Sequence, residues 1–305
     1  MRRYLVRRLL LLVPVVFGIL IVVFVLMRVV PGDPVRLMAG FDADESTVRM
    51  LRHELGLDRP LPIQFGYYVA QLVRGDLGIS LRSRRPVKEE IRDRFRNTLI
   101  LALSSTTLAV AVGAAIGVTA AYYHRSLVDY LSMATAVLGV SVPSYFLGIL
   151  LILLFSVVLD WLPAGGIGGL RALVLPALTL AASSSSIIAR MTRSSVLEAL
   201  TAGYVRTARA KGLHERLVVG RHALPNALIP LVTILGLEFG FILGGAILVE
   251  TVFSYPGVGW MMVEAIGTRD FPIVQGGVLV IALAFVLINL LVDVLYAVFD
   301  PRVSY

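Results

Sequence analysis

The side chains that most often perform catalysis occur in this 305-residue chain without the spacing that catalysis requires. An ATP-binding P-loop needs a Gly-Lys pair followed by Ser or Thr, but the two lysines, Lys88 and Lys211, follow valine and alanine. The four histidines are scattered rather than spaced as metal ligands, and the chain has no cysteine. The motifs H-E-x-x-H and G-x-S-x-G are also missing. The sequence therefore favours a conduit over an enzyme, with no catalytic residue and no metal site of its own.

Glu238 and three hydroxyl residues lie inside apolar stretches, where polar groups are costly and often functional. Glu238 is an ionisable residue within a long apolar run, and a structural and a functional role are both open for it. Thr179, Ser183 and Ser186 fall on one face of another run at helical spacing. Small hydroxyl residues serve helix packing, or they line a polar path between helices. From the sequence alone, both interpretations stay open for these residues.

A ladder of small residues occupies the same run as Glu238. Gly236, Gly240 and Gly244 repeat every four residues. Such spacing places them on one face of a helix and lets a second helix backbone approach closely. The second helix could belong to this chain, or it could lie across a pathway in a partner subunit. The sequence predicts a close helix contact without choosing between the two.

The composition explains why these residues sit in apolar surroundings. Hydrophobic residues make up 57% of the chain and charged residues 16%, and the mean hydropathy is +0.85. Soluble domains are about 45–50% apolar and about 25% charged. A soluble enzyme, a disordered chain and a coiled coil are therefore disfavoured. The net charge of +8 lies between apolar runs rather than in a basic-aromatic module, which favours membrane topology over nucleic-acid binding.

Six runs are long and apolar enough to cross a membrane, which takes about 20 residues. Only helices satisfy their backbone groups in lipid without a closed barrel. The sequence therefore predicts an all-α integral membrane protein with six transmembrane helices. The first run exceeds the length of a signal-peptide core, so we interpret it as a retained anchor. The predicted spans are 9–26, 99–123, 131–159, 172–189, 228–249 and 271–292.

Basic residues between the spans predict the orientation. With the N-terminus inside, the inside segments contain thirteen Lys and Arg, whereas the short outside loops 160–171 and 250–270 contain two. Positive residues are enriched in cytoplasmic loops, so both termini are predicted to be cytoplasmic. The segment 31–94 then lies outside, where acidic residues, apolar residues at helical spacing and Gly56 predict a small folded domain.

The segment 190–227 is the longest inside loop and contains the most informative pattern. Most of it is compatible with helix, and a short helix is predicted over 204–212. Tyr204, Ala208 and Lys211 fall on one face of that helix, at positions i, i+4 and i+7. A short helix that projects between two spans suits a docking surface for a soluble partner.

Basic residues and a glycine mark the end of this predicted helix. Arg206 and Arg209 sit together on another face. Gly212 is the predicted C-cap, and Arg209 and Lys211 in the last turn are favoured by the helix dipole. Two interpretations follow from this pattern: a docking surface for a protein, or a basic loop on anionic lipid.

The loop resembles the signature of permease subunits of ABC importers, which reads E-A-A, three residues, G, nine residues, I-x-L-P. With the pattern anchored on Gly212, Ala208 occupies the last Ala, and Leu224 and Pro225 occupy the closing Leu-Pro. The resemblance therefore covers both the end of the predicted helix and the start of the next span.

The departures from that signature resemble one subgroup, the dipeptide/oligopeptide/nickel permeases. Arg206, Thr207 and His222 stand where the general pattern has Glu, Ala and Ile, and the stretch YVRTARAKGL is similar to that group. The long outside segment resembles the first of the two permeases in such systems. Further resembling blocks span the chain in order: VPGDP, LGLDRPLP, GDLGISL, NTLILA, VETVFSYPGVG, RDFPIVQG and NLLVDVLYAVFDPR.

The resemblance implies a type I importer permease fold and three parts. Residues 1–30 form the cytoplasmic tip and first helix, 31–94 the extracytoplasmic segment, and 95–299 the permease core with the coupling loop 190–227. The implied ATPase-coupling residues are Tyr204, Arg206, Thr207, Ala208, Arg209, Lys211, Gly212, Leu224 and Pro225. Residues that could line a pathway or a subunit interface are Thr179, Ser183, Ser186, Gly236, Glu238, Gly240 and Gly244.

The resemblance also implies partners and a substrate class. A second homologous permease, two ATP-binding subunits that hold ATP and magnesium, an extracytoplasmic binding protein and membrane lipid surround such a chain in the cell inner membrane. Hydrolysis belongs to the partners, and the implied cargo is di- or oligopeptides. Nickel, glutathione or another small solute is the alternative cargo. An ion-coupled secondary transporter is a distant alternative, because the halves 1–150 and 151–305 show no repeat.

Overall fold

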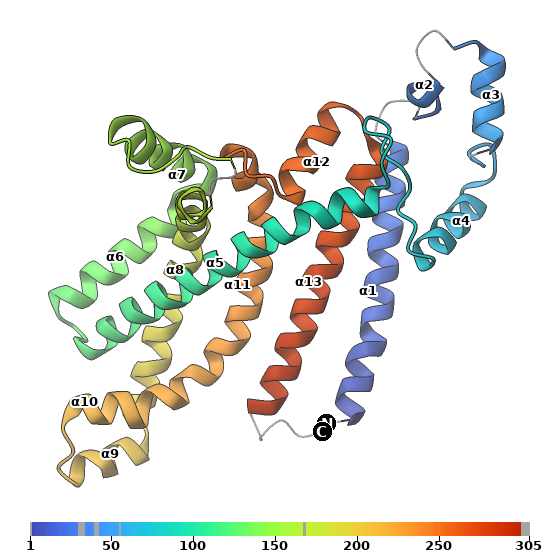
Figure 1. The fold of residues 1–305 in the computed structure, drawn as a ribbon. Coiled ribbons are helices and arrows are strands. Elements are labelled where there is room, and N and C mark those ends of the chain that lie inside the picture. Colours follow the sequence, from blue (N-terminus) through green and yellow to red (C-terminus); the bar gives the residue numbers. More distant parts are fainter. Residues whose placement is uncertain (1, 30–33, 40–42, 55, 167–168, 300–305) are drawn as a thin grey trace.

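The structure is a computed structural model that describes residues 2–29, 34–39, 43–54, 56–166 and 169–299. Long helices lie side by side, with short helices at both ends of the bundle (Figure 1). The helices are α1 Arg2–Val29, α2 Pro34–Ala39, α3 Glu45–Glu54, α4 Leu61–Val73, α5 Val87–Tyr122, α6 Leu127–Ser141, α7 Ser144–Leu151, the π-helix η1 Ile152–Val158, α8 Leu170–Thr201, α9 Gly203–Ala210, α10 Glu215–Leu217, the π-helix η2 Val218–Ala223, α11 Leu224–Val252, α12 Val258–Gly267 and α13 Phe271–Phe299.

Four helices of the described chain, namely α5, α8, α11 and α13, are long and apolar enough to cross a membrane. The predicted span 131–159 is wrong as a single helix, because α6 and the α7–η1 helix meet at an angle of 101°. Pro143 explains the break: it lacks an N–H and disfavours helical backbone at the residue before it. Val142 is accordingly extended, with φ −88° and ψ 123°. The first predicted span lies in α1, whose described apolar stretch, Leu10–Val25, is shorter than the others.

The helix α8 extends beyond the predicted span 172–189, so the predicted loop 190–227 begins as helix. The extension is held at its inner side, where Val196 and Ala199 are buried against α5 and the loop that follows. Arg193 of this extension forms a bidentate ion pair with the buried Asp129 of α6, at 2.6 and 2.7 Å. Packing therefore continues the helix where the apolar run ends.

Small residues allow a very close contact between α5 and α8. A Cβ on Gly113 would lie 2.6 Å from the Ser185 carbonyl oxygen, and a Cβ on Gly117 would lie 2.5 Å from that of Ala189. Only glycine permits this separation. The two helices consequently pack backbone against backbone, as small-residue spacing allows in membranes.

The segment between α1 and α5 forms helices, as predicted, and Val35 of α2 and Val48 of α3 are buried. Helix α3 opens after Asp44, whose carboxylate accepts from the Thr47 amide at 3.1 Å, and the chain turns at Gly56 with φ +64°. Helix α4 buries none of its side chains fully. It leans on α1 instead, where the rings of Phe24 and Phe65 meet edge to face at 5.2 Å.

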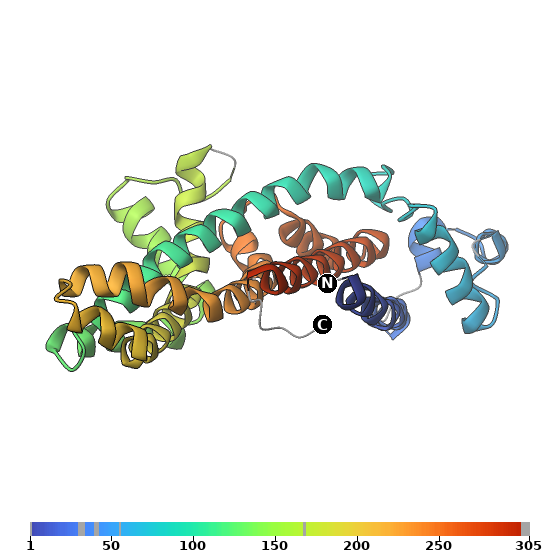
Figure 2. The same cartoon turned by 90° about the horizontal axis from the view of Figure 1, so that it is seen from below.

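The ends of the helices sort into two groups. The start of α1, the end of α13 and the α9–α10 hairpin lie at one end of the bundle, and α2, α3, α4 and α12 lie at the other (Figure 1). Seen from below, α9 and α10 lie beside the ends of α8 and α11 and away from α1 (Figure 2). This grouping is the one that the loop assignments in the sequence require.

Candidate functional site

The helix α9 is attached to the bundle by a narrow apolar face. Val205 and Ala208 are buried, and they pack with Ala121 at the end of α5, Val196 of α8 and Val218 of η2. Three elements that precede and follow α9 therefore hold it. A displacement of α9 would be transmitted directly to α5, α8 and α11.

The three residues that the sequence places on one face of this helix differ in burial. Of Tyr204, Ala208 and Lys211, only Ala208 is buried, and the other two are exposed. The buried partner of Ala208 is Val205, three residues away, because neighbours at i and i+3 share a helix face. Tyr204 and Lys211 thus belong to the outward surface of α9.

Arg209 is engaged within the hairpin rather than free for a partner. Its guanidinium donates to both oxygens of Glu215, at 2.6 and 3.1 Å. Hydrogen bonding from Arg209 holds the pKa of the Glu215 carboxyl below its usual value. Both side chains are half exposed, and such pairs contribute about 0–1 kcal/mol. Among the described residues, Arg206 and Lys211 have no ion-pair partner, so they are the cations that α9 presents.

Gly212 adopts the left-handed backbone that the sequence predicts for the end of this helix. Its φ is +75°, and its amide donates to the Arg209 carbonyl at 2.9 Å. Lys211 is the C-cap and Gly212 follows it, which is the usual position of a glycine stop. Leu224 and Pro225 open α11 beyond the hairpin, where Leu224 packs on the cluster around Val205 and Pro225 is exposed.

The hydroxyl residues of α8 divide into two kinds. Thr179 donates to the Leu175 carbonyl at 2.8 Å, and Ser186 donates to the Ala182 carbonyl at 2.9 Å, so both bond to their own helix. Ser183 instead lines a cavity of about 200 Å³ together with Glu238. Thr179 and Ser186 are therefore explained by bonding within their own helix, whereas Ser183 faces the cavity.

The glycine ladder of α11 is used within the chain at two of its three positions. A Cβ on Gly236 would meet Val292 of α13 at 2.5 Å, and one on Gly240 would crowd the ring of Phe285. Gly244 is exposed and would meet nothing within 4 Å. The close contact that the sequence predicts is therefore with α13, and only Gly244 is left open to a neighbouring subunit.

Glu250 is a structural residue that the sequence argument did not single out. It is fully buried, and it accepts from the Thr98 hydroxyl at 2.7 Å and from the Trp260 amide at 3.1 Å. The Thr98 oxygen in turn accepts from the Val258 amide at 2.9 Å. Glu250 thus ties α5, α11 and the start of α12 together. The signal in the sequence is its place in VETVFSYPGVG, where Gly257 leaves room because a Cβ there would run into the carboxylate.

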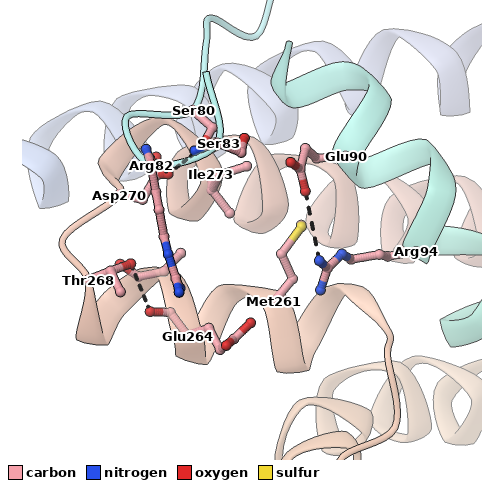
Figure 3. Close-up of a pocket in the computed structure, with 11 residues that line it drawn as sticks. Ser80, Arg82, Ser83, Glu90, Arg94, Met261, Glu264, Thr268, Asp270 and Ile273 are labelled. Carbon is pink, nitrogen blue, oxygen red and sulfur yellow. Dashed lines mark hydrogen bonds and ion pairs between the residues drawn. The ribbon is translucent and has the colours of Figure 1, made fainter. Parts of the chain in front are cut away.

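Asp270 plays a similar part directly before α13. Its buried carboxylate accepts from the Ser80 hydroxyl at 2.5 Å and from the amides of Leu81 and Arg82 at 3.1 and 3.2 Å. The loop before α5 is thereby fastened to the start of α13 (Figure 3). The pocket beside them has a volume of about 430 Å³ and is also lined by Glu264 of α12. The loop before α5 and the start of α13 are consequently joined in one connected surface.

The sequence belongs to a defined class of transport protein. The family described as "Binding-protein-dependent transport system inner membrane component" matches residues 113–305, and its N-terminal counterpart matches residues 1–102. The chain therefore belongs to this family of inner-membrane permeases. It is the permease component of an ABC importer, as the resemblance in its coupling loop predicted.

Relatives of the full length carry a narrower name. The glutathione transport system permease protein GsiC of Escherichia coli O6:H1 is 48% identical over 305 residues and covers all of both chains, and that of Salmonella typhimurium is equally similar. Among solved structures, the inward-facing MetNI methionine ABC transporter aligns with TM-score 0.60 at 18% identity, over 69% of this chain and 96% of that one. An amino acid ABC transporter aligns with TM-score 0.52 over 70% and 94%. These structures share the permease fold.

Proposed function

We propose that the chain imports small peptides, glutathione among them, as one of two different permease subunits. The observation that carries this proposal is the identity of 48% to glutathione permeases along the whole of both chains. Dipeptides and longer peptides are chemically close to glutathione, so the peptide group that the motifs resemble supports the same cargo class. Nickel and other small solutes remain alternatives that a transport assay would separate.

The energy source in this proposal lies in partner subunits. Two ATP-binding subunits hold ATP and magnesium and dock on α9, and an extracytoplasmic protein delivers the cargo. The attachment of α9 through Val205 and Ala208 supports this role, because it links the docking surface to three spans. ATP binding would draw α9 toward its counterpart in the second permease and open the pathway outward. Hydrolysis would reset the pathway inward.

The proposed orientation puts both termini and the α9–α10 hairpin in the cytoplasm. The excess of basic residues in those segments supports it. So does the grouping of the start of α1, the end of α13 and the hairpin at one end of the bundle. We assign residues 1–30, 31–94 and 95–299 to the first helix with its tip, the extracytoplasmic segment and the permease core.

Cysteine labelling is expected to report this orientation, because the natural chain has no cysteine that would interfere. The variants are Val73→Cys at the end of α4 and Lys211→Cys at the end of α9, both at exposed positions. A membrane-impermeant maleimide should label Val73→Cys in intact spheroplasts and Lys211→Cys only after permeabilisation. The opposite pattern would refute the proposed orientation.

Reconstitution is expected to show that ATP hydrolysis requires the partner subunits and does not occur in the permease alone. The chain alone in liposomes should neither hydrolyse ATP nor import glutathione, since neither lysine lies in a P-loop. Adding the second permease, the ATP-binding subunits and the binding protein should produce ATP-dependent uptake. Uptake by the chain alone, driven by an ion gradient, would instead support a secondary transporter.

A further inference from the structure

A carboxylate lies at the centre of α11, the span that follows the α9–α10 hairpin. Glu238 is 14 residues from each end of α11, and its exposed fraction is 4%. At a rise of 1.5 Å per residue, about 20 Å of helix separates it from either end. Such a position is near the middle of the membrane, where an ionisable residue is expected to face the protein or a polar cavity.

Glu250, in the same helix, shows what a purely structural carboxylate looks like in this chain. Each of its two oxygens accepts a hydrogen bond, from Thr98 and from the Trp260 amide. Glu238 has one polar neighbour of this kind, the hydroxyl of Ser184. No ion pair involves Glu238 among the described residues. Its hydrogen-bonding capacity is therefore largely unused by the fold.

The volume in front of Glu238 is polar on one side. The cavity of about 200 Å³ lies between α7, α8 and α11, and its polar wall consists of Ser144, Ser183, Ser184 and Glu238. A cavity of this size has room for several water molecules or for the charged end group of a small solute. Ser144 directly follows the break between α6 and α7, and broken helices at membrane depth are tolerated where they line a cavity.

We propose that this cavity binds the protonated amino group of a peptide during its passage. An ammonium group has three N–H donors and no acceptor. The Glu238 carboxylate supplies the countercharge, and the hydroxyl oxygens of Ser183 and Ser184 supply further acceptors. A carboxylate end of the cargo would be repelled. This inference rests on the proposed peptide import and adds the group by which the permease itself recognises the cargo.

The test compares two cargoes that differ in this amino group alone. The complete complex, with binding protein and ATP-binding subunits, is reconstituted with wild-type permease, Glu238→Gln or Glu238→Asp. The uptake rates of glutathione and of N-acetylglutathione are measured. For each cargo, the rate of the variant is divided by the rate of wild type, so that the preference of the binding protein cancels. Glu264→Gln, an exposed carboxylate of α12, is the matched control.

The expected result is a selective loss. Glu238→Gln should lower glutathione uptake about tenfold to a hundredfold, the range for losing a hydrogen bond to a charged group. It should change N-acetylglutathione uptake less than about twofold, and Glu238→Asp should recover part of the loss. An equal loss for both cargoes, or a failure of the variant to assemble with the second permease, would overturn the inference.

A labelling measurement covers the case in which wild type rejects the acetylated cargo. Modification of Glu238 by a hydrophobic carbodiimide, followed by mass spectrometry, should be slowed by glutathione in the working complex. Equal modification with and without glutathione would overturn the inference. A wild-type complex that imports no peptide with ATP would be a different failure, since it would remove the proposed function itself.

Discussion

Replacing Glu250 by alanine is expected to destabilise the permease by about 2–4 kcal/mol, because buried donors left without an acceptor cost about 1–3 kcal/mol each. The Thr98 hydroxyl and the Trp260 amide both lose their partner in this variant. The removed side chain also leaves a cavity where α5, α11 and α12 meet. The measurement is the thermal unfolding midpoint of the purified protein in detergent, together with its yield in the membrane.

Two further variants separate the lost hydrogen bonds from a general effect of mutation. Glu264→Ala removes an exposed carboxylate from α12 and should stay within about 0.5 kcal/mol of wild type. Gly257→Ala should lower the midpoint although its φ of −98° suits alanine, because the new Cβ would run into the Glu250 carboxylate. An unfolding midpoint of Glu250→Ala equal to that of wild type would show that these contacts do not stabilise the junction of α5, α11 and α12.

The spans could be predicted because a helix that crosses lipid needs a long run of apolar residues, and such a run is visible in the sequence. Apolar runs located α5, α8, α11 and α13 correctly, although packing extends α8 to Thr201. The run 131–159 concealed a bend, since its hydropathy is continuous across the break at Pro143. Hydropathy measures whether a segment tolerates lipid, and it carries no information about the direction of the chain.

The site was predictable only where local backbone chemistry decides it. A glycine after a short basic helix requires no tertiary knowledge, and Gly212 has the expected positive φ. The buried face of α9 depends on what Val205 meets in η2, and the engagement of Arg209 depends on the turn that brings Glu215 to it. Glu250 acts through a residue 152 positions away, Thr98. Contacts of this kind have no signature in a single sequence.

Replacing Gly212 by valine is expected to impair coupled transport about 5- to 30-fold. A side chain in the left-handed region costs about 1–2 kcal/mol, and that free energy corresponds to a population change of about 5- to 30-fold. Open space surrounds Gly212, so the strain is in the backbone and not in a clash. The end of α9 should therefore fray or shift without disturbing the buried face. The measurements are ATP-dependent uptake and the stimulation of ATP hydrolysis by the loaded binding protein.

Gly203→Ala is the matched control, because it changes a glycine at the other end of the same helix. Gly203 is helical, has no positive φ and would meet nothing within 4 Å. Its replacement should leave uptake and stimulation near wild type. If Gly212→Val also retained both, the end of α9 would not be part of the coupling path.

Charge-reversal variants of the two arginines of α9 test whether these residues contact the partner subunit or only maintain the shape of the α9–α10 hairpin. Arg206→Glu alters an exposed cation that has no ion-pair partner among the described residues, so it should weaken docking if the partner surface is acidic. Arg209→Glu also breaks the pair with Glu215, whereas the double variant Arg209→Glu with Glu215→Arg restores that pair in reverse. Uptake that recovers in the double variant would assign Arg209 to the shape of the hairpin. Uptake that stays low would assign it to the partner, because the restored pair no longer presents the same charge at that position.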